Sequence, residues 1–221
     1  MTTRTSIEIR TIHGEDLHNL LRDESARTEY APLRIRGEIP DGKAPIICVE
    51  GARAASRYGI EVARQIGAEL THAGAVVITG AGYGIGEAVL RSALEVGGRP
   101  IVVLASGADR IYPAAHADLI NETAFRGGCV ISPFLPGLPP SRHRFAVRNR
   151  LIAHIANAVV IIEAAARSTT RDLVTYAEDL GRPLLATPGP ITGPFSALPH
   201  RLIHDGRAQL ATGATDILAA L

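Results

Sequence analysis

The sequence predicts an α/β fold with a doubly wound, mostly parallel sheet and helices on both faces. Six short apolar runs each have the length of one buried strand, at residues 46–50, 75–79, 100–106, 129–132, 158–163 and 183–187. Segments with helical periodicity separate most of them, at residues 57–74, 84–98, 114–128, 146–156 and 170–181. Alternation of fully apolar strands with helices is typical of an extended Rossmann-like fold.

The first 44 residues are more polar and less regular than the rest of the chain. We expect a helix over 14–26, an extended piece over 33–37 and a turn at Pro40-Asp41-Gly42. The sequence therefore predicts two parts. Residues 1–44 form an amino-terminal extension that packs on the core, and residues 45–221 form the Rossmann-like domain.

Composition restricts the class of partner. The net charge is only +1, so no global basic field indicates nucleic acid. Lys43 is the single lysine, and every other basic side chain is an arginine, so anion contacts from basic side chains fall to arginine. No Cys/His pair has metal-ligand spacing, and Cys48 and Cys129 lie within apolar runs as buried free thiols would. Without a signal core or an apolar stretch of membrane-spanning length, we expect a cytoplasmic protein that contacts no membrane.

Ligands of doubly wound sheets bind at the carboxyl ends of the strands. The turns that leave the predicted strands are rich in glycine and arginine, at residues 51–56, 80–84, 106–113, 133–145, 164–170 and 188–200. Backbone amides, helix N-termini and guanidinium groups therefore gather at one edge of the sheet. This combination favours a polyanion or nucleotide site.

The glycine turn in 76-VVITGAGYGIGEAV-89 is the strongest single phosphate signal. It resembles the dinucleotide turn of short-chain dehydrogenases, but that family needs a Tyr-x-x-x-Lys pair. The only lysine, Lys43, follows Ile39 at that spacing, so the dehydrogenase interpretation fails. We expect the turn to bind a different phosphate, through Gly80, Gly82, Tyr83 and Gly84.

Arginines and an aromatic residue follow the long proline-rich turn, in 141-SRHRFAVRNR-150. Arg144, Arg148 and, less well, Arg150 fall near one helical face, and Phe145 adds a stacking surface for a base. The alternative is a solvated face whose arginines pair with acids, but few acids lie nearby in the sequence. Further candidates are Arg53, Ser56 (which can cap the next helix), Arg167 and Thr169, with capping by Ser168 or Thr169 an equal alternative.

Catalytic sets are hard to assemble from this sequence. The eight histidines are scattered, and Glu163, an acid that ends a predicted strand, has no partner carboxylate or nucleophile nearby. An edge rich in donors and poor in bases suits binding better than chemistry. We therefore predict no catalytic residue, no metal and no cofactor.

Several motifs, in order, resemble the DNA processing protein A (DprA/Smf) family. The matching segments are 51-GARAASRYG-59, 79-TGAGYGIG-86, 107-GADRIYP-113, 145-FAVRNRLIA-153, 158-AVVIIEAAARS-168, 186-ATPG-189 and 201-RLIHDGRAQLAT-212. The resemblance covers roughly residues 30–221 and implies a Rossmann-like core. It also implies a homodimer that binds single-stranded DNA, assists RecA-type recombinase loading in recombination or DNA uptake, and is not an enzyme.

The same resemblance places Ser106, Gly107 and Asn149 in the DNA pocket, beside Arg53, the 80–84 turn, Arg148 and Arg150. The competing interpretation is a nucleotide-binding sensor or a phosphoribohydrolase-like enzyme of a related fold. Cytokinin-activating phosphoribohydrolases carry a Pro-Gly-Gly-x-Gly-Thr turn, whereas the corresponding turn here is 164-AAARSTT-170. Hydrolysis is therefore the weaker alternative, while nucleotide binding without cleavage stays open.

Overall fold

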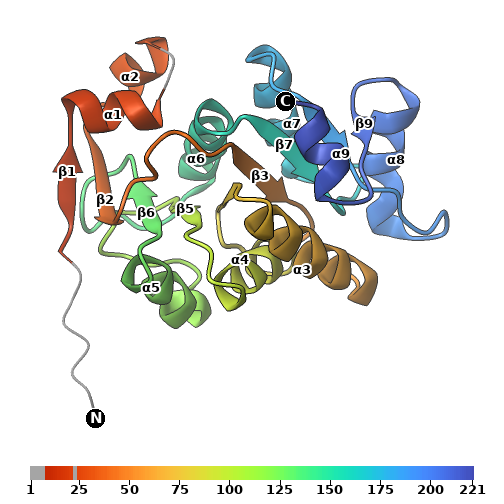
Figure 1. Ribbon diagram of the computed structural model, residues 1–221, viewed down its shortest axis with the longest axis horizontal. Coiled ribbons are helices and arrows are strands. Elements are labelled where there is room, and N and C mark those ends of the chain that lie inside the picture. The colour runs from red at the N-terminus through yellow and green to blue at the C-terminus, as the bar shows by residue number, and fades with distance from the viewer. Residues whose placement is uncertain (1–7, 22–23) are drawn as a thin grey trace.

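The computed structural model describes residues 8–21 and 24–221. Residues 1–7, where we expect no signal sequence, and residues 22–23 of the expected first helix lie outside the described residues. The described strands form one sheet (Figure 1): β1 (Arg10–Ile12), β2 (Leu33–Gly37), β3 (Ile46–Glu50), β4 (Val76–Thr79), β5 (Ile101–Val103), β6 (Cys129–Ser132), β7 (Ala158–Ile161), β8 (Leu184–Ala186) and β9 (Gln209–Leu210).

Helices connect most of these strands. The described α-helices are α1 (Gly14–Leu20), α2 (Glu24–Tyr30), α3 (Arg57–His72), α4 (Ile85–Glu95), α5 (Ala117–Phe125), α6 (Arg142–Ile155), α7 (Thr170–Asp179), α8 (Ala197–His204) and α9 (Ala214–Ala219). Two short 3-10 helices, η1 (Ala114–His116) and η2 (Pro194–Ser196), precede α5 and α8.

The sheet order is β1-β2-β6-β5-β4-β3-β7-β8-β9. Strands β3 to β9 pair in parallel, and β1 and β2 form an antiparallel edge next to β6. From β3 the chain builds outward through β4, β5 and β6, then returns to the other side of β3 and builds β7, β8 and β9. The predicted doubly wound, mostly parallel α/β fold is confirmed, and its reversal of strand order at β3 and β7 is where such folds place a ligand.

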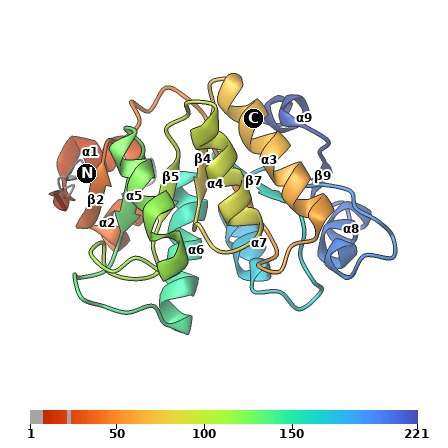
Figure 2. The same ribbon diagram turned by 90° about the horizontal axis from the view of Figure 1, so that it is seen from below.

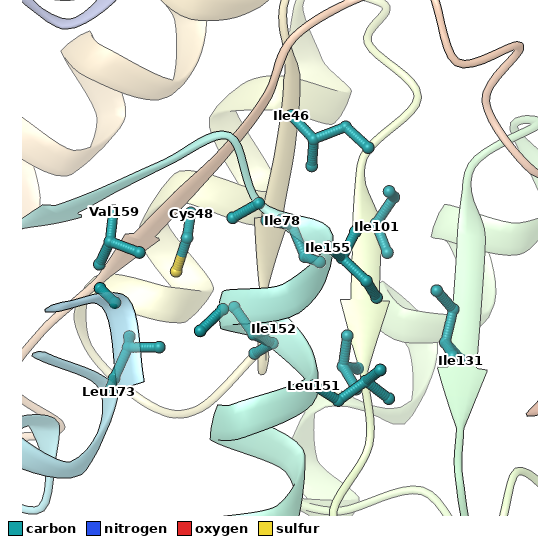
Figure 3. Packing of buried hydrophobic residues seen from close by; sticks show 14 of the residues in the cluster. Ile46, Cys48, Ile78, Ile101, Ile131, Leu151, Ile152, Ile155, Val159 and Leu173 are labelled. Atoms are coloured by element: carbon teal, nitrogen blue, oxygen red, sulfur yellow. The ribbon is translucent and has the colours of Figure 1, made fainter. Parts of the chain in front are cut away.

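Successive residues of one strand face opposite sides of the sheet, so each strand contributes to two cores. In β3, Cys48 packs in the core beneath α6 and α7, whereas Ile47 and Val49 pack beneath α3 and α4. Figure 2 shows α3, α4 and α5 in front of the sheet, with α6 and α7 behind it. Helix α6 turns Leu151, Ile152 and Ile155 onto the strands (Figure 3). A strand covered on both faces must be apolar throughout, which explains the unbroken runs in the sequence.

Several expected elements differ from the structure in their bounds, and three of them illustrate the differences. The segment expected as one helix over 14–26 holds two helices, α1 and α2, on either side of residues 22–23. Helix α6 begins at Arg142 rather than 146, because the Ser141 side chain caps it by accepting a hydrogen bond from the Arg144 amide at 3.3 Å. Strand β5 ends at Val103, well before residue 106. The domain boundary near residue 44 stays a prediction.

The described residues include no helix long and apolar enough to cross a membrane. They also include no cluster of three or more His, Cys, Asp or Glu side chains that could hold a metal ion.

Both cysteines are free and buried, as predicted. Burial raises the pKa of the Cys129 thiol to about 12 and raises the pKa of Cys48 well above its usual value. A thiol whose pKa is higher in the folded state than in the unfolded state stabilises the fold below its unfolded pKa of about 8.5. That contribution to stability is lost as the pH rises above the unfolded pKa and towards the folded pKa.

We therefore expect the free energy of unfolding in urea to fall between pH 7 and about pH 10, since the unfolded state releases the two thiol protons. A variant with both Cys48→Ala and Cys129→Ala should lose much less stability over the same interval. Equal alkaline losses in the two proteins would contradict the assignment.

Candidate functional site

A cleft of about 990 Å³ lies at the carboxyl ends of the central strands. Its walls come from the turns after β3, β4 and β7, from the loop after β5 and from the first turns of α6 and α7. The lining residues include five arginines (Arg53, Arg142, Arg148, Arg167 and Arg171) and two acids (Glu50 and Asp172), a net side-chain charge of +3. The cleft is therefore electropositive although the whole chain is nearly neutral.

Arg148 lies at the base of this cleft and is only 8 % exposed. Its nearest acid is Glu50, with 3.9 Å between Arg148 Nη1 and Glu50 Oε1. Among the described residues its guanidinium makes no hydrogen bond, and its buried Nε has no partner. Burial lowers the pKa of Arg148, and the Glu50 carboxylate opposes that shift. Burying a cation whose N–H donors have no acceptor costs free energy, and a bound anion would offset that cost.

Gly80 makes room for this arginine. A Cβ at position 80 would lie 1.0 Å from Arg148 Nη1, so no other residue allows the guanidinium to rest against the turn after β4. The glycine was predicted to bring backbone close to a phosphate. In the structure it brings backbone close to the guanidinium.

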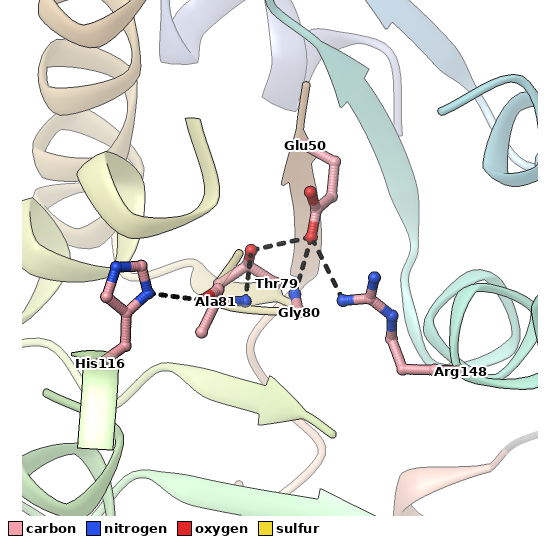
Figure 4. A network of polar contacts seen from close by, with 6 residues as sticks. All are labelled: Glu50, Thr79, Gly80, Ala81, His116 and Arg148. Atoms are coloured by element: carbon pink, nitrogen blue, oxygen red, sulfur yellow. Dashed lines mark hydrogen bonds and ion pairs between the residues drawn. The ribbon is translucent and has the colours of Figure 1, made fainter. Parts of the chain in front are cut away.

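Glu50 organises the glycine turn from the end of β3 (Figure 4). Its Oε1 accepts hydrogen bonds from the Gly80 amide at 2.7 Å and from Thr79 Oγ1 at 2.9 Å. Thr79 Oγ1 in turn accepts from the Ala81 amide at 3.2 Å. One carboxylate thus joins the turn to Arg148. Sequence reasoning missed Glu50, although an acid that ends an apolar strand at this edge was a usable signal.

The phosphate prediction for the turn is refined by two observations. The Ile85 amide, the first of α4, donates to Ala52 O at 3.2 Å, so this helix amide is already occupied. The amides of Gly82, Tyr83 and Gly84 donate to no other described residue. These three turn amides can therefore donate to an anion, whereas the Ile85 amide cannot.

Phe145 forms an aromatic centre for the cleft. The Arg53 guanidinium lies 5.0 Å from its ring centroid and that of Arg148 lies 5.5 Å away. Tyr112 packs edge-on at 5.9 Å and is 40 % exposed. Aromatic rings flanked by guanidinium groups provide stacking surfaces for a base and charge for a phosphate.

Most predicted binding residues line the cleft. They are Arg53, Gly80, Gly82, Tyr83, Phe145, Arg148, Asn149, Arg167 and Thr169. Six others do not line it, namely Ser56, Gly84, Ser106, Gly107, Arg144 and Arg150. Their binding roles stay predictions, and the structure assigns most of them contacts of another kind.

The three arginines of α6 that were predicted near one face, Arg144, Arg148 and Arg150, make different contacts. Arg144 donates to Pro139 O at 2.6 Å and thereby holds the proline-rich loop. Arg150 pairs with Glu29 of α2 at 3.3 Å. Of these three, Arg148 lines the cleft. Arg150, two residues further along the helix, points about 200° away from it. The sequence argument overlooked acids that are distant along the chain, and both Glu29 and Glu50 are of that kind.

The serines and glycines outside the cleft support its loops. Ser56 caps α3, accepting from the Gly59 amide at 3.1 Å, and donates to Glu163 Oε1 at 2.6 Å. Ser106 Oγ is buried and donates to Arg110 O. The Gly107 amide donates to Leu138 O at 2.9 Å. The predicted cap at Ser56 is confirmed.

Glu163, noted in the sequence as the best lone acid, is 3 % exposed. It accepts from both the amide and the hydroxyl of Ser56, at 2.8 and 2.6 Å. Its carboxylate therefore fastens the start of α3 to the end of β7. At the start of α7, Thr169 is the N-cap residue but its side chain makes no capping hydrogen bond. The Ser168 Oγ instead accepts a hydrogen bond from the Thr170 amide at 3.1 Å.

Sequence reasoning also missed lining residues beyond Glu50. Those with charged or aromatic side chains are Arg142, Tyr112, Arg171, Asp172 and Phe195. Arg142 and Tyr112 lie in segments that had been noted, but only the fold shows that their positions meet the cleft.

Fold and cleft together define a Rossmann-like α/β protein with an arginine-lined cleft at the carboxyl edge of its sheet. The chain belongs to the DNA recombination-mediator protein A family, the DprA/Smf family, whose model matches residues 11–221. The resemblance of the ordered motifs is thereby confirmed.

Relatives and solved structures agree with this assignment. A Mycobacterium tuberculosis relative that carries the DNA processing protein DprA name is 42% identical over 77% of this chain. Protein Smf of Escherichia coli is 36% identical over 89% of it. These alignments cover 43% and 52% of the two relatives, so the chain spans about half of their length. The crystal structure of Streptococcus pneumoniae DprA aligns with a TM-score of 0.81 at 30% identity, covering 96% of this chain and 74% of that one.

A second structure, of DNA processing protein A from Helicobacter pylori, aligns with a TM-score of 0.82. Its identity is 21%, and the alignment covers 96% of this chain and 95% of that one. At this identity the likeness establishes the fold alone. That structure was described for its single-stranded DNA binding mode.

Proposed function

We propose that this chain binds single-stranded DNA, without sequence preference, in the cleft around Arg148. The observation that carries the proposal is the buried guanidinium of Arg148. Among the described residues it makes no hydrogen bond, and its ion pair with Glu50 spans 3.9 Å. A phosphate in the cleft would supply the missing acceptors. Arg53, Arg167 and the turn amides of Gly82 and Tyr83 would contact neighbouring phosphates, and Phe145 would stack on a base.

Family membership supports the polynucleotide over a single nucleotide. The family is described as a recombination mediator, and the Helicobacter pylori relative binds single-stranded DNA. We extend the proposal to a homodimer that assists loading of a RecA-type recombinase and performs no catalysis. The cleft supports the last point, since the acids that line it among the described residues are Glu50 and Asp172, and Glu50 is engaged by Thr79, Gly80 and Arg148.

The test is fluorescence anisotropy with a labelled oligothymidylate of about 16 nucleotides, titrated with protein at several salt concentrations. Each phosphate contact should contribute a slope of about −0.7 to the plot of log affinity against log salt. Mononucleotides should compete weakly. Saturable mononucleotide binding that the oligonucleotide does not displace would instead favour the nucleotide-binding sensor, and no binding at low salt would reject the proposal.

A further inference from the structure

We propose that His116 is a positioning residue that holds the 80–84 turn in the shape that presents its amides to a phosphate. The inference rests on the proposed function, because the ligand is the phosphate group of a polynucleotide. His116 ends η1, is 5 % exposed and does not line the cleft. It therefore acts through the turn and does not touch the ligand.

The turn needs support because Ala81 has a φ of +50°. An L-residue in the left-handed region costs about 1–2 kcal/mol. On the side of the strands, the Gly80 amide donates to Glu50 Oε1 and the Ala81 amide donates to Thr79 Oγ1. On the opposite side His116 Nδ1 lies 2.9 Å from Ala81 O (Figure 4), so the ring donates to the carbonyl of the strained residue.

His116 also fixes the exposed part of the turn. The Tyr83 ring packs edge-on against the imidazole at a centroid distance of 4.7 Å. Tyr83 is 47 % exposed and lines the cleft. The histidine thus supports both the backbone of the turn and the aromatic side chain that the turn presents.

The second ring nitrogen is held by α4. His116 Nε2 lies 3.2 Å from Glu87 Oε2, and the other oxygen of Glu87 accepts from Arg91 at 2.9 Å. The imidazole therefore bridges the turn and the helix that follows it. Because Nδ1 donates to Ala81 O, the Nε2 contact with the carboxylate is a hydrogen bond when the ring carries both protons, and it then fixes the plane of the ring.

Two variants separate positioning from bulk packing. In His116→Ala the contacts to Ala81 O, to the Tyr83 ring and to Glu87 are all lost, whereas in His116→Asn the side-chain amide nitrogen can take the place of Nδ1 and still donate to Ala81 O. We expect His116→Ala to weaken oligothymidylate binding about fivefold to tenfold, the equivalent of one lost hydrogen bond, and His116→Asn to stay within about twofold of the parent protein. Thr123→Ala, which removes a buried hydroxyl that donates to Leu119 O in neighbouring α5, is the control and should leave binding unchanged.

A second measurement does not depend on DNA. Hydrogen exchange of the Gly80 and Ala81 amides, which are hydrogen-bonded in the turn, should be about tenfold faster in His116→Ala than in the parent protein, and restored in His116→Asn. Unchanged exchange in His116→Ala, or an asparagine variant as impaired as the alanine variant, would overturn the inference. A parent protein that fails to bind DNA would reject the proposed function, while the exchange experiment would still decide the role of His116.

Discussion

Arg148→Ala is expected to weaken single-stranded DNA binding about 30- to 100-fold. The change removes a buried cation whose donors have no hydrogen-bond acceptor among the residues that the structure describes, and losing one partner of a buried charge contact costs about 2–3 kcal/mol or more. The slope of log affinity against log salt should also become less negative by about 0.7. Fluorescence anisotropy at matched salt concentrations measures both quantities.

Arg64→Ala is the matched control for Arg148→Ala. Arg64 lies on α3, pairs with Glu95 at 2.7 Å and does not line the cleft, yet its loss changes the net charge equally. Its affinity should stay within about twofold of the parent, because exposed ion pairs contribute little. Arg148→Lys keeps the charge but loses the planar fork, so it should fall between the parent and Arg148→Ala. Equal effects of Arg64→Ala and Arg148→Ala would mean that only overall charge matters.

Gly84→Ala is expected to destabilise the fold by about 3 kcal/mol or more. Gly84 has a φ of +72°, and a Cβ there would lie 2.3 Å from Ala52 O and 2.6 Å from Arg53 O. Both neighbours are backbone atoms of the turn after β3, so neither can move as a flexible side chain would. Left-handed strain and displacement of the adjoining turn therefore act together. Urea unfolding measures the loss in free energy.

Gly74→Ala separates these two causes. Gly74 also has a positive φ, +81°, but a Cβ there would meet nothing within 4 Å. Its cost should be the conformational strain alone, about 1 kcal/mol. If the two alanine variants lose equal stability, the close approach of the two turns has no energetic consequence.

The strands and helices of the core could be predicted because their pattern is local. Strands β3 to β8 are buried on both faces, so they read as unbroken apolar runs, and β2 was expected at residues 33–37, where it lies. Strand β1 has three residues, of which one is buried, so it is too short to show the alternation of apolar and polar residues that predicts a strand. Helices α8 and α9 are short and follow proline- and glycine-rich sequence, and no element had been assigned to them.

The candidate site could be predicted only in part. The turns were correctly expected at one edge of the sheet, since parallel strands align their carboxyl ends. Which turn contacts which depends on strand order, and β3 lies between β4 and β7. That order brings Arg53 and Glu50 to the glycine turn, and it brings Glu163 to Ser56.

By itself, the sequence determined the doubly wound class, the edge at which polar turns gather and the use of arginine for anion contacts. These properties follow from periodicity, from connection order and from a chain with a single lysine. The tertiary structure alone decided that Arg148 is the cation with spare donors while Arg150 is paired with Glu29. The physical reason is that the free energy of a charge depends on its burial and on its partners, and here the partners come from distant strands and helices.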